Sequence, residues 1–109
     1  MKKSLMAFVA LGIMTIVSGK SFDEKLQREC LYVLGDRDSG RYDSEAHGYT
    51  LGVVTGVMMM TPKEQRTRLS KKSLGYISDS VCLTALKDKR NRRFMFKYQE
   101  AAKRLLVKP

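Results

Sequence analysis

The sequence predicts an all-α fold: a small four-helix domain with one disulfide, placed after an N-terminal signal peptide. Three observations lead to this prediction. Two segments begin with side chains that typically cap helices. Apolar residues recur at intervals of three or four in four stretches, as on the buried side of a helix. The two cysteines, Cys30 and Cys82, both lie in such apolar stripes.

The N-terminal segment has the three zones of a secretory signal. Two lysines precede a largely apolar stretch over residues 5–17, and the small residues Ser18 and Gly19 follow it. This stretch is shorter than the ~20 residues needed to span a bilayer, but it suits a signal peptide. We expect cleavage after Gly19, with residues 1–19 as signal peptide and residues 20–109 as one helical domain. An uncleaved anchor is the alternative. The mature protein is expected to be periplasmic or secreted.

The two cysteines are expected to form a disulfide. A small exported domain usually pairs its cysteines, because its compartment is oxidising and its core is thin. We therefore predict a Cys30–Cys82 bond, with two free buried thiols as the alternative. Two cysteines and one histidine are too few and too scattered for a structural zinc site. The sequence predicts no metal and no cofactor.

The first helix is predicted over residues 22–34. Ser21 and Glu24 form a capping box at its start, and Gly35 ends it. The stretch that follows, up to Asp43, is rich in glycine and aspartate and predicts an irregular loop. The apolar stripe of this helix comprises Phe22, Leu26, Cys30 and either Val33 or Leu34.

A second helix is predicted over residues 45–60, with Ser44 as its cap. It is almost uncharged after Glu45, so we expect it to be the central and most buried element. Its glycines recur every four residues on one face, where another backbone is expected to pack closely. A strand or a broken helix is the alternative, because residues 53–55 favour strands. The resulting helix-packing motif consists of Gly48, Tyr49, Gly52 and Gly56.

Two further helices are predicted in the C-terminal half. Thr61, Pro62 and Glu64 belong to a second capping box, which starts a polar and exposed turn. Asn91 is the expected cap of the last helix. The disulfide would tie the first helix to the third around the second. The third apolar stripe comprises Leu74, Ile77, Val81 and Ala85, with Cys82 beside it, and the fourth comprises Phe94, Tyr98, Ala101 or Ala102, and Leu105.

The sequence holds no complete catalytic motif. His47 is the only histidine, and the sequence fixes no serine or cysteine nucleophile near it. We therefore expect a hydrogen-bonded structural histidine. Acidic residues crowd the loop after Gly35, but counted from Asp36 the fifth position of a calcium loop is Gly40, which carries no oxygen ligand. The chain is predicted not to be an enzyme.

Charge is distributed unevenly along the chain. Residues 20–60 hold five Lys or Arg and seven Asp or Glu, whereas residues 61–109 hold fourteen and four. A basic half favours an anionic partner, such as an acidic protein face, a lipid head-group surface or a polyanion. Export counts against nucleic acid. The candidate patch for an anionic partner is Lys87, Lys89, Arg90, Arg92 and Arg93, for which a solvated linker is the alternative.

Residues 46–53 (AHGYTLGV) contain a Gly-Tyr-x-x-Gly-Val core. This core resembles the small periplasmic type VI secretion immunity proteins of the Tai and related families. The resemblance implies a helical domain that binds and blocks a peptidoglycan-cleaving amidase toxin. A cysteine often precedes Gly-Tyr in those families; His47 stands there in this chain, so one disulfide of the family pattern is absent. The plan is also similar to periplasmic stress chaperones of the HdeA type, which lack the basic bias.

Together these observations favour an exported, non-enzymatic protein-binding domain, most concretely an immunity-like inhibitor of a cell-wall-degrading toxin. The expected partner is another protein with an acidic surface, while contact with a membrane surface stays open. A stress chaperone is the second hypothesis. A small enzyme, or an accessory subunit of a secretion or surface apparatus, is the third. The sequence predicts no oligomeric state.

Overall fold

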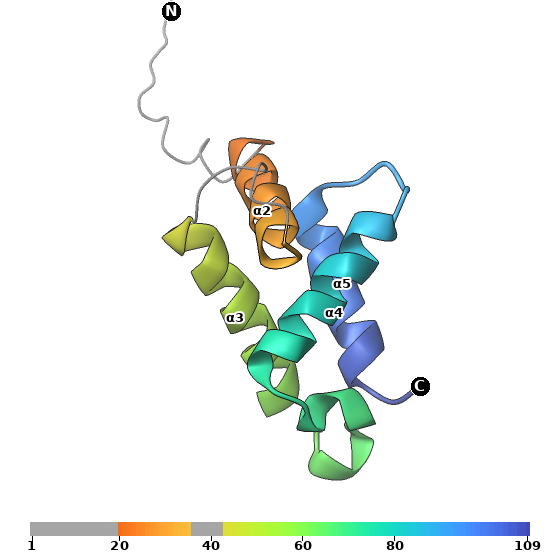
Figure 1. Cartoon of the computed structure of the whole chain (residues 1–109). Helices are drawn as coiled ribbons and strands as arrows, with labels where there is room; N and C mark the ends of the chain where they lie inside the picture. The colour runs from red at the N-terminus through yellow and green to blue at the C-terminus, as the bar shows by residue number, and fades with distance from the viewer. Residues whose placement is uncertain (1–19, 36–42) are drawn as a thin grey trace, which may run out of the picture.

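The computed structural model describes residues 20–35 and 43–109, which form four α-helices and two short 3-10 turns (Figure 1). The predicted signal peptide lies outside the described residues. The helices are α2 (Lys20–Val33), α3 (Ser44–Met59), α4 (Leu74–Lys87) and α5 (Phe94–Leu106), and the turns are η2 (Lys63–Gln65) and η3 (Arg68–Lys71). The described part of the chain is therefore the predicted all-α domain with four helices.

Helix α5 packs against all three of the other helices. Figure 1 shows α5 behind α4, with α2 and α3 to the left of these two helices. Most of the predicted apolar stripes are buried, with three exceptions. At the end of α2, Val33 is half-buried and Leu34 is exposed. Leu74 is exposed at the start of α4, and Leu106 rather than Leu105 is fully buried at the end of α5. The fully buried side chains from three helices include Leu26, Ile77, Tyr98 and Leu106.

The prediction that the second helix is the most buried element is wrong. Helix α3 is continuous, but only Ala46, Thr50 and Val54 are buried in it. Helices α4 and α5 bury five residues each. The apolar composition of α3 overstates its burial, because its glycines have no side chain to place in a core. Figure 1 shows α3 along the outer side of the bundle.

The close packing predicted at the glycine face is also wrong. Within the described structure, a Cβ atom built on Gly48, Gly52 or Gly56 would meet no heavy atom within 4 Å. Tyr49 does pack. Its ring centroid lies 5.3 Å from that of Phe22, edge to face, and its hydroxyl accepts a 2.6 Å hydrogen bond from the side chain of Gln99. Helix α3 is therefore anchored through Tyr49 and its buried stripe, and its glycines face open space.

The predicted disulfide is confirmed. Cys30 on α2 and Cys82 on α4 are bonded, their Cα atoms are 5.1 Å apart, and both side chains are fully buried. They are 52 residues apart in the sequence. Closing a loop of that length stabilises a fold by about 4 kcal/mol, because it restricts the unfolded chain. The bond therefore fixes α2 against α4 in a domain whose core is small.

Two helices start earlier than predicted, α3 by one residue and α2 by two. Asp43, not Ser44, caps α3: its carboxylate accepts a 2.9 Å hydrogen bond from the backbone N–H of Ala46. Helix α2 begins at Lys20, so the predicted cap Ser21 lies inside the helix. The predicted end of α2 is confirmed at Gly35, whose φ of 102° lies in the left-handed region that glycine adopts without strain.

The second predicted capping box starts only a single short turn. The hydroxyl of Thr61 does not cap that turn; it donates instead to the backbone carbonyl of Val57, at the end of α3, over 2.6 Å. Pro62 precedes η2, as expected of a proline at the start of a helical turn. The segment is held to the end of the chain by the hydrogen bond from the N–H of Thr67 to the carbonyl of Leu106.

The start of α5 is capped from another helix. Arg93, not the predicted Asn91, precedes the first turn, and no side chain of its own segment caps it. Asp23 on α2 supplies the carboxylate: it accepts a 3.4 Å hydrogen bond from the N–H of Met95 and pairs with Arg93 at 3.3 Å. A carboxylate at a helix N-terminus is favourable because the first N–H groups have no partner within the helix. Asp23 thus joins the first and last described helices.

None of the helices in residues 20–35 and 43–109 is both long and apolar enough to cross a membrane.

Candidate functional site

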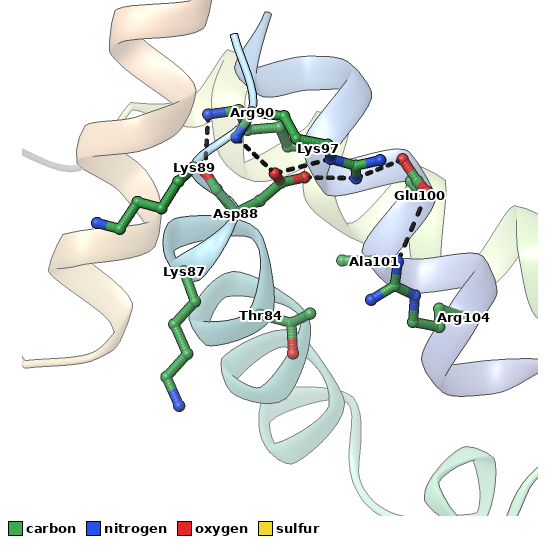
Figure 2. Close-up of a pocket in the computed structure, with 9 residues that line it drawn as sticks. All are labelled: Thr84, Lys87, Asp88, Lys89, Arg90, Lys97, Glu100, Ala101 and Arg104. Carbon is green, nitrogen blue, oxygen red and sulfur yellow. Dashed lines mark hydrogen bonds and ion pairs between the residues drawn. The ribbon is translucent and has the colours of Figure 1, made fainter. Parts of the chain in front are cut away.

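A basic hollow of about 520 Å³ lies where the loop after α4 meets α5 (Figure 2). Five of its charged residues are cationic and two are acidic. The cations come from the end of α4, the following loop and α5, so the fold brings together side chains 17 positions apart in sequence. The lining residues are Thr84, Lys87, Asp88, Lys89, Arg90, Lys97, Glu100, Ala101 and Arg104.

Arg90 is the central residue of this hollow. Its guanidinium donates hydrogen bonds to both carboxylate oxygens of Asp88, at 3.0 and 2.7 Å, and to Glu100 at 2.8 Å. The backbone N–H of Arg90 also donates to Asp88. Arg92 adds a 2.7 Å bond to Glu100. Such forked contacts are strongly directional, so the α4–α5 loop is fixed to the face of α5.

These contacts shift the pKa values of the charged residues in the hollow. The hydrogen bonds from Arg90 hold the pKa of Asp88 well below its usual range. The same guanidinium lowers the pKa of Glu100, and the two carboxylates raise the pKa of Arg90. Hydrogen bonds to the charged form of a group favour that form. The network therefore stays ionised in mild acid.

The predicted patch divides into two groups. Arg90, Arg92 and Arg93 point their guanidinium groups at carboxylates of the domain itself. Lys87 and Lys89 make no ion pair within the described residues, and Figure 2 shows both side chains extending away from the network. They are the two members of the predicted patch whose charge is available to a partner.

Sequence reasoning missed two cations of the hollow, Lys97 and Arg104. Lys97 donates a 2.9 Å hydrogen bond to the backbone carbonyl of Asp88, and Arg104 lies 3.7 Å from Glu100 on the next helical turn. They are seven positions apart and so lie on the same side of α5. That spacing, together with the nearby basic run, was a signal that could have placed them in the patch.

A second, apolar groove of about 470 Å³ runs along the other side of α5, against α3. No carboxylate lines it in the described structure, and one cation, Lys103, does. The sequence did not predict this groove, because it assigned the glycine face to a buried contact. The lining residues are Gly52, Val53, Gly56, Val57, Met60, Thr61, Gln99, Lys103 and Val107.

The expected hydrogen bond of His47 is confirmed, and its partner is a buried glutamate. His47 Nδ1 lies 3.0 Å from Glu29 Oε2. The Glu29 side chain is only 1% exposed, and its other oxygen has no hydrogen-bond partner in the described part of the chain. The sequence analysis overlooked Glu29, although its position three after Leu26 places it on the buried stripe of the first helix.

A buried tyrosine lies in the same region of the core. Tyr98 is fully buried, and burial raises its pKa to about 12, although the nearby hydroxyls of Ser78 and Thr50 oppose part of that shift. The glutamate charge contributes to the same increase. The described residues contain no group of three or more His, Cys, Asp or Glu side chains placed to hold a metal ion.

No family model, curated protein or solved structure matches this chain. The resemblance to the immunity families therefore rests on residues 46–53 and on the order of the helices.

Proposed function

We propose that this chain is an exported, non-enzymatic protein-binding domain that docks an acidic face of another protein through the basic hollow. One observation carries the proposal. The Arg90 network fixes the loop to α5, while Lys87 at the end of α4 and Lys89 in that loop make no ion pair within the described residues. Cations held in place on a rigid frame lose little conformational freedom on binding, and they speed the approach of an oppositely charged partner.

The more specific form of the proposal is an inhibitor of a cell-wall-degrading toxin. The Gly-Tyr-x-x-Gly-Val core at residues 48–53 supports it through its resemblance to the immunity families. The Cys30–Cys82 disulfide suits an oxidising compartment, in which such an inhibitor would meet its toxin. An inhibitor also needs a rigid surface, and the network around Arg90 provides one.

A stress chaperone that unfolds in acid is less well supported by the electrostatics. The carboxylates of Asp88 and Glu100 both have lowered pKa values, so their ion pairs persist when the pH falls below neutral. A chaperone of that kind would expose apolar surface in mild acid. We expect no binding of a hydrophobic dye at pH values between about 4 and 7. Dye binding that rises steeply in that range would favour the chaperone.

Capture from the envelope fraction of the source organism tests the docking proposal. The bait is the mature protein, and the test variant carries Lys87→Glu and Lys89→Glu. We expect the wild type to retain a partner with an acidic surface and the variant to retain about tenfold less of it, with a strong dependence on salt. If the captured partner degrades peptidoglycan, the wild type should inhibit that activity and the variant should not.

The matched control is the double variant Lys71→Glu and Lys72→Glu. It makes the same change in net charge just before α4, at the opposite end of that helix from Lys87. We expect this control to capture the partner as well as the wild type does. Equal capture by all three proteins would contradict the proposal, because it would show that the basic hollow makes no contribution to binding.

A further inference from the structure

The groove between α3 and α5 is an apolar surface with an unusual composition. From Ser44 to Met59, α3 contains one carboxylate, Glu45, and no lysine or arginine. A helix that is apolar on all sides is normally buried on all sides. Here one side is not covered by any other described residue, and Met59 and Met60 at its end are 82% and 87% exposed.

The shape of the groove suits a helix. Gly52 and Gly56 form part of the α3 wall, and a Cβ atom at either position would meet nothing within 4 Å in the described structure. Val53 and Val57 also contribute apolar surface from α3, while Val107 lies just after the end of α5. A glycine wall lets a second backbone approach closely. Proteins commonly bind an amphipathic helix in an apolar groove between two helices.

Charge indicates which occupant fits. Lys103 lines the groove, and no acidic residue of the described chain does. A second copy of this chain is disfavoured, because residues 20–109 carry nineteen Lys or Arg against eleven Asp or Glu. A symmetric pairing of two such grooves would also bring two Lys103 side chains together. An acidic occupant removes both conflicts.

The groove and the basic hollow lie on the two sides of one helix. Lys97, Glu100 and Arg104 of α5 face the hollow, whereas Gln99 and Lys103 face the groove. Lys103 is therefore the cation that faces an occupant of the groove, while Arg104 belongs to the hollow.

We infer that this groove binds an acidic amphipathic helix of the docking partner, with its apolar side against Gly52 and Gly56 and its carboxylates toward Lys103. This inference rests on the proposed function and adds the kind of segment that the partner contributes. It gives a role to the glycine face of α3, which packs against no other described residue of the domain.

The probe is a synthetic peptide of about 18 residues, long enough to span α3. It places Ala and Leu on one helical face and Glu on the other. Two control peptides accompany it: one has the same composition in scrambled order, and one has Lys in place of Glu. Titration of the labelled peptide into the mature protein, followed by fluorescence anisotropy, measures the dissociation constant. We expect saturable binding of the acidic amphipathic peptide and at least about tenfold weaker binding of both controls.

The blocking variant is Gly52→Leu, whose side chain would occupy the groove. Leucine favours helix over glycine and has open space here, so the variant should be at least as stable as the wild type in thermal unfolding. We expect it to weaken peptide binding by about tenfold. The matched control is Gly48→Leu, one turn earlier on α3 and outside the groove lining. Its dissociation constant should stay within about threefold of the wild type.

Three outcomes would overturn the inference: no saturable binding of the acidic peptide, equal binding of the Lys peptide, or undiminished binding to Gly52→Leu. Self-association of the wild type that Gly52→Leu abolishes would also overturn it, since the occupant would then be a second copy. The proposed function can be tested apart from this inference. If Lys87→Glu with Lys89→Glu loses a captured envelope partner while Gly52→Leu keeps it, the basic hollow docks the partner and the groove does not.

Discussion

The domain contains two groups of carboxylates that basic side chains bind in opposite surroundings. Glu29 is buried, and its one side-chain partner within the described residues is His47, whose Nδ1 lies 3.0 Å from Glu29 Oε2. Asp88 and Glu100 lie at the surface and are bound by several guanidinium groups through Arg90 and its neighbours. Burial differs most between the two groups, and burial determines what each group can contribute.

In the core, a carboxylate has lost its hydration, so the loss of its one partner leaves a charge without compensation. At the surface, water replaces a lost partner, and exposed ion pairs add little to stability. The buried pair therefore contributes mainly to the stability of the domain, and the surface network contributes mainly to the positions of its cations. The following predictions test this distinction, from the largest expected effect to the smallest.

The largest effect is expected for His47→Ala. Removing the imidazole leaves the buried Glu29 carboxylate without its hydrogen-bond partner among the described residues. We expect a loss of about 2 to 3 kcal/mol in the free energy of unfolding, at the lower end for a broken buried pair because His47 itself is partly exposed. Urea unfolding under oxidising conditions measures it. As a control, Glu29→Met removes the charge and keeps the volume, and should cost less than about 1 kcal/mol. A larger loss of unfolding free energy for Glu29→Met than for His47→Ala would contradict the view that the unpartnered buried carboxylate is what destabilises the domain.

The second effect is a loss of stability at alkaline pH, caused by the buried Tyr98 near this pair. Tyr98 has a pKa raised to about 12 by burial, so the folded state favours its neutral form. Its contribution to stability is complete below the unfolded-state pKa near 10 and is lost as the pH rises from about 10 to about 12, with a size on the order of 2 to 3 kcal/mol. Absorbance of tyrosinate should show a late step from Tyr98, in addition to that of Tyr49, whose pKa burial also raises. Tyr98→Phe should remove that step and flatten the alkaline loss of stability.

The third effect concerns the surface network in acid. The pKa of Asp88 is lowered in the folded state, so its contribution is present above the unfolded-state pKa near 4 and is lost as the pH falls further. We expect a modest decrease in the thermal midpoint between about pH 5 and pH 2, beyond that of Asp88→Asn. A wild type and a variant with the same acid profile would show that the surface network makes no such contribution.

The smallest effect on stability is expected for Arg90→Met. It removes the central guanidinium and keeps much of the aliphatic length, and all its partners are solvated. The thermal midpoint should therefore change little, while the affinity for an acidic partner should fall because the loop that carries Lys89 and follows Lys87 is no longer fixed to α5. Calorimetry and the capture assay measure the two quantities. A large decrease in the midpoint with unchanged capture would reverse the roles assigned to the two groups.

The sequence predicted the helices and the disulfide because both depend on local spacing. Apolar residues at helical intervals placed Leu26, Ile77 and Tyr98 on buried faces, and Cys30 and Cys82 lay on those same faces. Composition failed for α3. The apolar character of that helix predicts burial, but the glycines at 52 and 56 contribute no side chain that a core could enclose.

Contacts between distant segments could not be predicted from one sequence. The bond from Arg90 to Glu100 joins a loop to the second turn of α5, and the cap that Asp23 gives to Met95 spans 72 residues. Neither has a local sequence pattern. The basic run contributes cations to the hollow, but which of them pair with carboxylates of the domain depends on these long-range contacts.

The cap that Asp23 provides has a consequence for how the chain is completed during synthesis. The first described helix supplies the carboxylate that starts the last one, and the end of the last helix holds the turn at Thr67. Both of these contacts need residues of α5, so neither can form before that helix has been synthesised. A nascent chain that stops before residue 94 therefore lacks both the helix that Asp23 caps and the wall against which α2, α3 and α4 pack. Closure of the domain therefore waits until its C-terminal residues have been synthesised.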